Sequence, residues 1–272
     1  MRFMKNLLTI VFCSILVTSC RNTGTEKGFV IDKRKSPTAI VTMSQEYFPD
    51  SNFRKALQRK VPMAEGDSLT NEIVSNVEGL YLSGLCIKSL KGIEYFTALK
   101  QIDCSENLLE EIDISQNVML ERFECMSNQL ARLDVTHNPL LIALGCCNNL
   151  LTELDVTKSS NLAELLCNEN KIKSIDLSNC PKLYELGVVN CDLKELDVTK
   201  NINLELLYCS RNKFNELDLR NNTKLRRLVC YPPSVPSVKI MRPKGKSDLG
   251  IDSIQIWRSR VNIWWSSYDM TH

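Results

Sequence analysis

A repeat of 21 residues constrains this chain more than any other feature of its sequence. Leucines recur at that fixed step through the middle of the chain, at Leu99, Leu120, Leu141, Leu162, Leu183, Leu204 and Leu225. A column of cysteines follows these leucines (Cys104, Cys125, Cys146, Cys167, Cys209 and Cys230, with Val188 in the fifth unit), and a column of asparagines follows the cysteines (Asn107, Asn128, Asn149, Asn170 and Asn212, with Cys191 in the fifth unit). Self-similarity at such a period is typical of repeat proteins, in which each unit contacts only its neighbours.

The alternation inside one unit predicts two short strands. Each unit reads LxxLxCxxNxLxxLDVxxNxx and holds the pattern LxxLx(C/V/L)xxN twice. Phe123 and Cys125 are separated by one residue, so they point to the same side of an extended strand. The asparagine that follows suits a turn, because its side chain bonds backbone groups that no strand satisfies. We therefore expect each coil to contribute two parallel strands to a common core, with neighbouring coils roughly 4.8 Å apart.

This motif resembles the leucine-rich repeat, in particular its nested 21-residue class, sometimes called IRREKO, over about residues 77–240. The resemblance implies an α/β fold: a right-handed solenoid dominated by short parallel strands. The chain is similar in this respect to secreted bacterial leucine-rich-repeat lipoproteins. The fold implies a binding surface, because regular coils offer no deep cleft for catalysis.

The two ends of a solenoid need caps, since an open end exposes core and strand edges. Residues 41–76 are expected to form a helical N-terminal cap. A short helix follows Phe48, with Asp50 or Ser51 as its N-cap and an apolar face of Phe53, Leu57 and Val61, and a second short helix is expected near residues 70–75.

Residues 241–272 are rich in strand formers and are expected to form a β-rich C-terminal cap. Trp257, Trp264 and Trp265 would then cover the last coil with their aromatic area. The alternative role for these tryptophans is to stack on sugars.

The first twenty residues predict export and a lipid anchor. Arg2 and Lys5 precede an apolar run over residues 7–17, which is too short to span a bilayer. The segment ends Val17-Thr18-Ser19-Cys20, which resembles a bacterial lipobox, and this resemblance implies lipidation of Cys20. An ordinary secretory signal, with Cys20 incidental, is the alternative. Residues 1–20 are thus a signal peptide, residues 21–40 a flexible tether, and the expected location is the cell envelope at the outer membrane, on a face that the sequence leaves open.

The ladder cysteines are predicted to be small buried hydrophobic residues. Their Cβ vectors run parallel along the stack, which opposes disulfide formation. Cys180 and Cys191 replace turn residues, whereas Cys147 is expected to point outward as a reactive thiol. An aspartate column in the second half of each unit is expected to bond with a Ser or Thr two residues later, and cation binding there is the alternative: Asp113, Asp134, Asp155, Asp176, Asp197 and Asp218.

Other functional classes receive little support from the composition. The net charge is +2 without a basic stripe, which disfavours nucleic-acid binding. His137 and His272 are the only histidines, so an enzyme that uses Cys147 with His137 is a remote alternative. The stretch from residue 61 to 72 is similar to a degenerate EF-hand, but Val61 and Met63 stand where calcium ligands are needed. We expect neither a metal nor a cofactor.

The outward positions of the first strands are the candidate ligand site. They combine apolar and aromatic side chains with a charged rim, which is the usual appearance of a contact surface. The residues predicted to bind are Arg122, Met126, Leu166, Val189, Leu206, Tyr208, Arg227 and Tyr231. The predicted function is a membrane-anchored extracytoplasmic module, without catalysis, that binds a protein, peptide or glycan. The alternatives are that a cap or loop covers these positions, or that the chain has a structural or adhesive role in the envelope with no single ligand.

Overall fold

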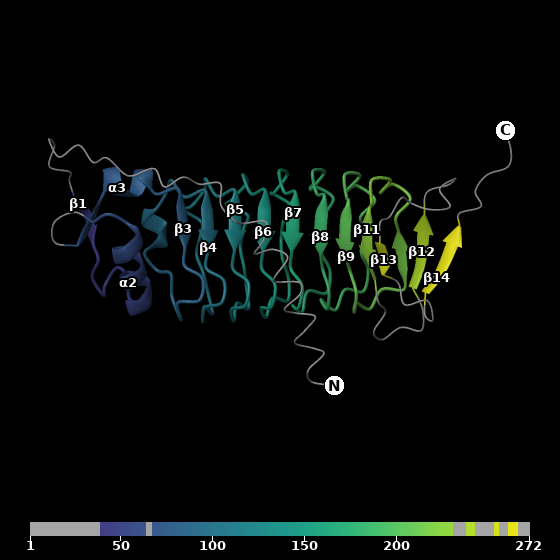
Figure 1. Ribbon diagram of the computed structural model, residues 1–272, viewed down its shortest axis with the longest axis horizontal. Coiled ribbons are helices and arrows are strands. Elements are labelled where there is room, and N and C mark those ends of the chain that lie inside the picture. The colour runs from purple at the N-terminus through teal and green to yellow at the C-terminus, as the bar shows by residue number, and fades with distance from the viewer. Residues whose placement is uncertain (1–38, 64–66, 231–237, 243–252, 256–260, 266–272) are drawn as a thin grey trace. The chain divides into compact units, whose positions relative to one another are not determined.

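The repeats form a nine-stranded parallel sheet (Figure 1). The computed structural model describes residues 39–63, 67–230, 238–242, 253–255 and 261–265, all within one compact unit that starts at Pro37. The sheet runs in the order β13-β11-β9-β8-β7-β6-β5-β4-β3. Its strands are β3 (Gly79–Tyr81), β4 (Gln101–Asp103), β5 (Arg122–Glu124), β6 (Ala143–Gly145), β7 (Glu164–Leu166), β8 (Glu185–Gly187), β9 (Leu206–Tyr208), β11 (Arg227–Val229) and β13 (Ser253–Gln255).

The strand register follows the sequence repeat. Phe123 of β5 pairs with Leu144 of β6, which is one repeat later, and Leu144 pairs in turn with Leu165. The step from β3 to β4 is one residue longer, since Leu80 pairs with Ile102. A one-residue slip would turn every core side chain outward, so the apolar pattern holds this register.

The core runs through the stack along the leucine and cysteine columns. Leu120, Phe123 and Cys125 are fully buried, and the ladder cysteines expose at most 1% of their surface. All ten cysteines of the described segments are free thiols, as the parallel Cβ vectors predict. Burial raises the pKa of the Cys104 thiol well above its usual range, so this thiol stays neutral and behaves as a hydrophobic side chain.

A buried asparagine ladder closes each turn after the first strand. The Asn128 Nδ2 donates to the Cys125 carbonyl at 3.1 Å and to the Cys104 carbonyl of the preceding coil at 3.0 Å. Its Oδ1 accepts from the Leu109 backbone N–H at 3.0 Å, so one side chain satisfies backbone groups of two coils. At the ladder position taken by Cys191, the thiol donates to the Cys167 carbonyl at 3.1 Å and preserves one of these bonds.

The second half of most coils is not a strand, and the prediction of two strands per coil is wrong there. Leu133 and Val135 point inward and are buried as predicted. However, the Thr136 N–H donates a hydrogen bond to the Asp134 side chain, and the Asn138 amide donates one to the Ile114 carbonyl. Because side chains satisfy these backbone groups, no continuous ladder forms between the second halves. The exception in the described repeats is β10 (Glu216–Asp218), which pairs in parallel with β12 (Val238–Arg242), and β12 pairs with β14 (Val261–Trp265).

The N-terminal cap contains the two helices that the sequence predicts. Helix α2 (Ser51–Lys60) has Asp50 as its N-cap, which accepts from the backbone N–H groups of Asn52 and Phe53, both at 2.8 Å. Its Phe53 and Leu57 are buried, as is Val61. Thr70 caps α3 (Asn71–Asn76), and strands β1 (Ala39–Thr42) and β2 (Ser68–Thr70) pair antiparallel beside it.

Side chains of this cap contact the first coil. The second oxygen of Asp50 accepts from the Lys88 N–H at 2.8 Å. The ring of Phe48 lies against Gly92, next to the 3-10 helix η1 (Ile93–Tyr95), where a Cβ atom would come within 2.1 Å of the ring. Gly92 also has a φ of 105°, which L-residues rarely adopt, so glycine is required here for two reasons.

Several predicted features lie outside the residues that the structure describes. Cys20, Trp257 and Tyr231 lie beyond the described residues, and Trp264 and Trp265 are described only as backbone in β14. Within the described ranges, the helices are too short or too polar to cross a bilayer.

Candidate functional site

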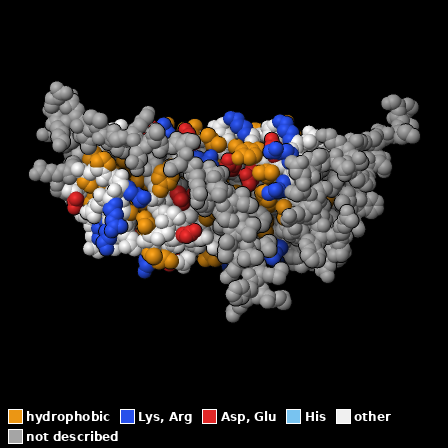
Figure 2. All heavy atoms as spheres, viewed as in Figure 1, with side chains coloured by type: hydrophobic (Ala, Val, Ile, Leu, Met, Phe, Trp, Pro, Cys, Tyr) orange, Lys and Arg blue, Asp and Glu red, His pale blue; other side chains and the backbone are white. Residues whose placement is uncertain are grey.

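The candidate site is the outer surface of the nine-stranded sheet, which we call the strand surface. It consists of the positions of Arg122, Glu124 and Met126 and their described counterparts in the coils of β4, β6 to β9 and β11. Parallel strands in register stack these positions into three columns along the sheet. Figure 2 shows one side of the stack, on which hydrophobic, acidic and basic side chains are interspersed.

The middle column alternates between long side chains and glycine. It reads Glu124, Gly145, Leu166, Gly187, Tyr208 from β5 to β9. A Cβ on Gly145 would lie 1.8 Å from the Glu124 Oε2, and a Cβ on Gly187 would lie 2.7 Å from the Leu166 Cδ2. Glu124 and Leu166 therefore each lie over the glycine of the next coil.

The first column contains an ion pair that spans two coils. The Arg122 Nη2 lies 3.0 Å from the Glu164 Oε2, and the two residues are separated by the small Ala143 of β6. The Tyr184 hydroxyl donates to the other oxygen of Glu164 at 2.5 Å. Burial and this hydrogen bond raise the pKa of Tyr184, so it stays a protonated donor. Both oxygens of Glu164 thus have a partner, and we call Arg122, Glu124, Glu164 and Tyr184 the β6 cluster.

Glu124 is the member of the β6 cluster that has a buried carboxylate oxygen, its Oε2, without a hydrogen-bond partner among the described residues. Burial raises the pKa of Glu124 to about 7, Arg122 opposes the shift, and Asp103 and Glu164 add to it. Burial likewise raises the pKa of Glu185, with Glu164 adding to the rise and Arg227 opposing it.

The structure alters the predicted ligand patch. Met126, Val189, Leu206 and Arg122 are half-buried, and Arg227 is exposed. Leu166 and Tyr208 expose only 5% and 7% of their surface, so the expectation that they form an exposed apolar patch is wrong. Alternation along a strand gives the direction of a side chain, but it does not say whether neighbouring groups cover it.

Cys147 is also not the accessible thiol that the sequence predicts. It exposes 7% of its surface, and its sulfur accepts a hydrogen bond from the Asn168 amide at 3.4 Å. Among the described cysteines, the exposed thiol is Cys86 in the first coil.

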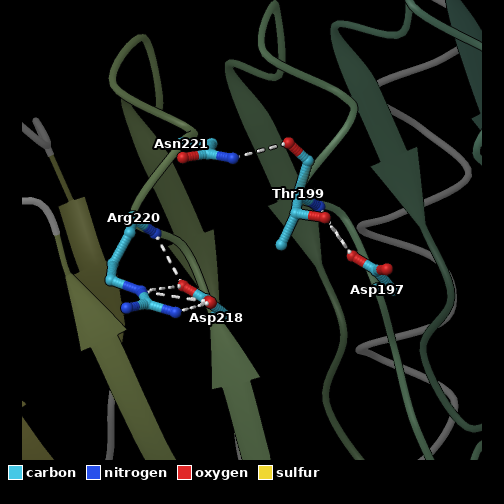
Figure 3. Close-up of polar contacts among 5 residues, drawn as sticks. All are labelled: Asp197, Thr199, Asp218, Arg220 and Asn221. Atoms are coloured by element: carbon cyan, nitrogen blue, oxygen red, sulfur yellow. Dashed lines mark hydrogen bonds and ion pairs between the residues drawn. The ribbon is translucent and has the colours of Figure 1, made fainter.

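The aspartates of this column accept hydrogen bonds within their own turns, as predicted (Figure 3). The Asp197 Oδ1 accepts from the Thr199 N–H at 2.9 Å and from its hydroxyl at 2.6 Å. Asp218 instead pairs with Arg220, and the Asn221 amide donates to the Thr199 carbonyl, which ties this coil to the one before it. Hydrogen bonds from Thr157 lower the pKa of Asp155. Over the described residues, no cluster of three or more His, Cys, Asp or Glu side chains is placed to hold a metal ion.

The sequence reasoning missed two features. Exposed apolar side chains lie in the segments that lead into the first strands: Val118, Met119, Leu140, Ile142 and Ile202. The sequence pattern that indicates them is an apolar residue in the short segment between the second Asn of one unit and the first strand of the next. A hollow of about 750 Å³ is lined by Lys88, Leu108, Glu110, Glu111 and Gln129, away from the strand surface.

Comparison with known proteins places this geometry in a known architecture. Neither a protein-family model nor a curated protein matches the sequence. The functional domain of InlJ from Listeria monocytogenes, described as including a cysteine ladder, is 28% identical with a TM-score of 0.61. It covers 79% of this chain, and this chain spans 55% of its length. The fold is a leucine-rich-repeat solenoid.

Two further solved structures share this leucine-rich-repeat fold. Internalin C2 from Listeria monocytogenes is 16% identical, with a TM-score of 0.65 over 82% of this chain and 97% of its own. A leucine-rich-repeat protein from Leptospira interrogans is 22% identical, with a TM-score of 0.55 over 63% of this chain and 51% of its own. All three are bacterial, and the ladder from Cys104 to Cys230 gives this solenoid the feature named for InlJ.

Proposed function

We propose that this chain is a membrane-anchored extracytoplasmic binding module, without catalysis, whose strand surface binds a protein partner. The observation that carries the proposal is the strand surface itself, a regular sheet surface on which the half-buried Met126 and Leu206 lie among charged groups. Contact surfaces of proteins combine apolar side chains with charged ones in this way. Peptide and glycan ligands are the other candidates for the same surface.

The membrane anchor is proposed from the sequence at residues 17–20. Cys20 would carry the lipid, which would hold the solenoid at the outer membrane through the tether of residues 21–40. Metabolic labelling with a fatty-acid analogue tests this proposal. The full chain is expected to incorporate label and to sediment with membranes, whereas the Cys20→Ala variant is expected to do neither. Equal labelling of the two would contradict the anchor.

The non-enzymatic part of the proposal is supported by the separation of the candidate catalytic pair. Cys147 is buried on the strand surface, whereas His137 is exposed in a turn of another coil, 3.8 Å from Asp134. A nucleophile and its base need to be within hydrogen-bond reach of each other.

Photo-crosslinking in intact cells tests the binding surface. A photoreactive amino acid replaces Leu206 or Met126 in the full chain, and the matched controls carry it at Leu150 and Ile202, which are exposed apolar residues off the strand surface. The proposal predicts a discrete crosslinked product at Leu206 and Met126 that is absent at the controls and is lost when a second substitution, Arg227→Glu, is added. Equal, diffuse crosslinking at all four positions would instead favour a structural or adhesive envelope protein.

A further inference from the structure

We propose that the β6 cluster receives a lysine or arginine side chain of the protein partner, which pairs with the carboxylate of Glu124. This inference rests on the proposed function and deepens it by naming the chemistry of the contact.

The geometry makes Glu124 different from the acidic residue beside it. Glu164 is satisfied within the chain, by Arg122 at one oxygen and by Tyr184 at the other. Glu124 lies with its Oε2 against Gly145, where only a residue without a Cβ leaves room for it. That oxygen is buried without a hydrogen-bond partner among the described side chains and backbone groups, while the residue as a whole remains partly open to solvent.

The charge of the surroundings favours a cation. Asp103, Glu164 and Glu185 share the strand surface with Glu124, and Arg122 is engaged in its ion pair with Glu164. A buried carboxylate without a compensating hydrogen bond is costly. An ammonium or guanidinium group supplies both the opposite charge and the missing donor, and charge-assisted hydrogen bonds of this kind are roughly twice as strong as neutral ones.

The neighbouring residues favour a long cationic side chain over a compact cation. The half-buried Met126 follows Glu124 on the same surface, and part of its side chain is open to a partner. The aliphatic stem of a lysine or arginine packs on such apolar groups while its charged end reaches the carboxylate. An amino sugar carries the charge without that stem.

Nuclear magnetic resonance of the purified protein tests the inference with a simple probe. The probe is Nα-acetyl-lysine methylamide, and the corresponding norleucine derivative, which has a similar stem but no ammonium group, is its control. We expect the lysine probe to shift the Gly145 amide and the Glu124 carboxyl carbon in a saturable manner, and the norleucine probe to leave both unchanged. Glucosamine is the third probe, and saturable binding of glucosamine without binding of the lysine probe would overturn the inference in favour of a glycan.

Two variants and one control test whether Glu124 supplies the carboxylate that binds the lysine probe. Glu124→Gln is expected to weaken binding of the lysine probe at least tenfold, and Gly145→Ala is expected to weaken it as well, because the new Cβ displaces the Glu124 carboxylate. Glu153→Gln removes an exposed carboxylate from the second half of the β6 coil and is expected to leave binding unchanged. Unchanged binding by the Glu124→Gln variant, with a native spectrum, would overturn the inference.

The two proposals fail in different ways. A discrete crosslink at Leu206 together with no response to the lysine probe would retain the binding surface and remove the cationic contact. A saturable response of Glu124 to the lysine probe with diffuse crosslinking would support the cation site while contradicting a single protein partner.

Discussion

Carboxylates in the first and second halves of the coils show opposite pKa shifts. In the second half, Asp134 and Asp155 are exposed, and hydrogen bonds from the threonine two residues later lower their pKa values. In the first half, burial raises the pKa values of Glu124 and Glu185. The aspartates therefore stabilise their own turns, whereas the Glu124 carboxylate remains to pair with a group from outside the chain.

This difference sets opposite responses to pH. An acid whose pKa is lowered by folding adds stability above its ordinary pKa, and that contribution is lost as the pH falls through the folded value. An acid whose pKa is raised does the reverse: the folded state gains most while the acid is protonated, and the gain is lost as the pH rises from the ordinary value through the folded one. Glu124 therefore lowers the stability of the protein progressively as the pH rises from 4.5 to about 7, and the loss persists at higher pH. Asp155 instead stabilises the protein above its ordinary pKa.

The largest expected effect comes from removing the charge of Glu124. Because its pKa rises from 4.5 to about 7 on folding, ionisation costs up to about 3 kcal/mol at pH 8. Glu124→Gln is expected to raise the free energy of unfolding by up to that amount at pH 8 and to leave it nearly unchanged at pH 4.5. Urea denaturation at the two pH values measures this, and equal effects at both would remove the distinction between the two carboxylate columns.

The next effect comes from the aspartate column. Asp155→Ala removes the acceptor of two hydrogen bonds from Thr157, at 2.9 and 2.6 Å, and is expected to lower the free energy of unfolding by about 1 kcal/mol, as for other lost side-chain caps. Asp155→Asn keeps the Oδ1 acceptor and is expected to lose less than half as much. Thermal denaturation at pH 7 measures both variants, and an equal loss would mean that the charge, and not the turn, is what matters.

The third substitution separates burial from backbone effects. Gly145→Ala places a Cβ against the flexible end of Glu124, so the carboxylate moves and its pKa is expected to fall toward 4.5. At pH 4.5, where the ionisation of Glu124 contributes little, the change in the free energy of unfolding is expected to stay under about 1 kcal/mol. Gly187→Ala is the matched control, because it meets Leu166 and Asn168 instead of a carboxylate. A pH titration of Glu124 in both variants measures the effect, and a shift of the same size in the control would refute the role of Gly145.

The smallest effect is expected where exposed side chains bridge coils. The Lys182 Nζ donates to the Asn161 Oδ1 at 2.7 Å, and Lys182 is exposed. Lys182→Met is expected to change the free energy of unfolding by less than about 0.5 kcal/mol. Urea denaturation checks this baseline, and a loss as large as that of Asp155→Ala would show that hydrogen bonding between coils does not depend on burial.

Much of the fold follows from the sequence because the repeat and the alternation act together. The step between successive leucines sets the register, and the inward positions of Phe123 and Cys125 set the core. The pattern wrongly predicted a second strand in most coils. The Asp134 and Asn138 side chains form hydrogen bonds with backbone groups that a strand ladder would require.

The site was less predictable than the fold. Periodicity shows which way a side chain points, so it predicted which positions lie on the outer side of the sheet. It does not show that Leu166 and Tyr208 are covered, or that Glu124 lies over Gly145. Those facts depend on the side chains of adjacent coils, which share no fixed pattern with the repeat.

The most direct test is a carbon-detected titration of the side-chain carboxyl groups in the purified protein. We expect Glu124 to titrate with a midpoint near 7 and Asp155 to titrate below 3.8, the ordinary value for aspartate. A midpoint for Glu124 near 4.5, the ordinary value for a solvated glutamate, would contradict the claim that the strand surface holds a carboxylate that the fold itself does not satisfy.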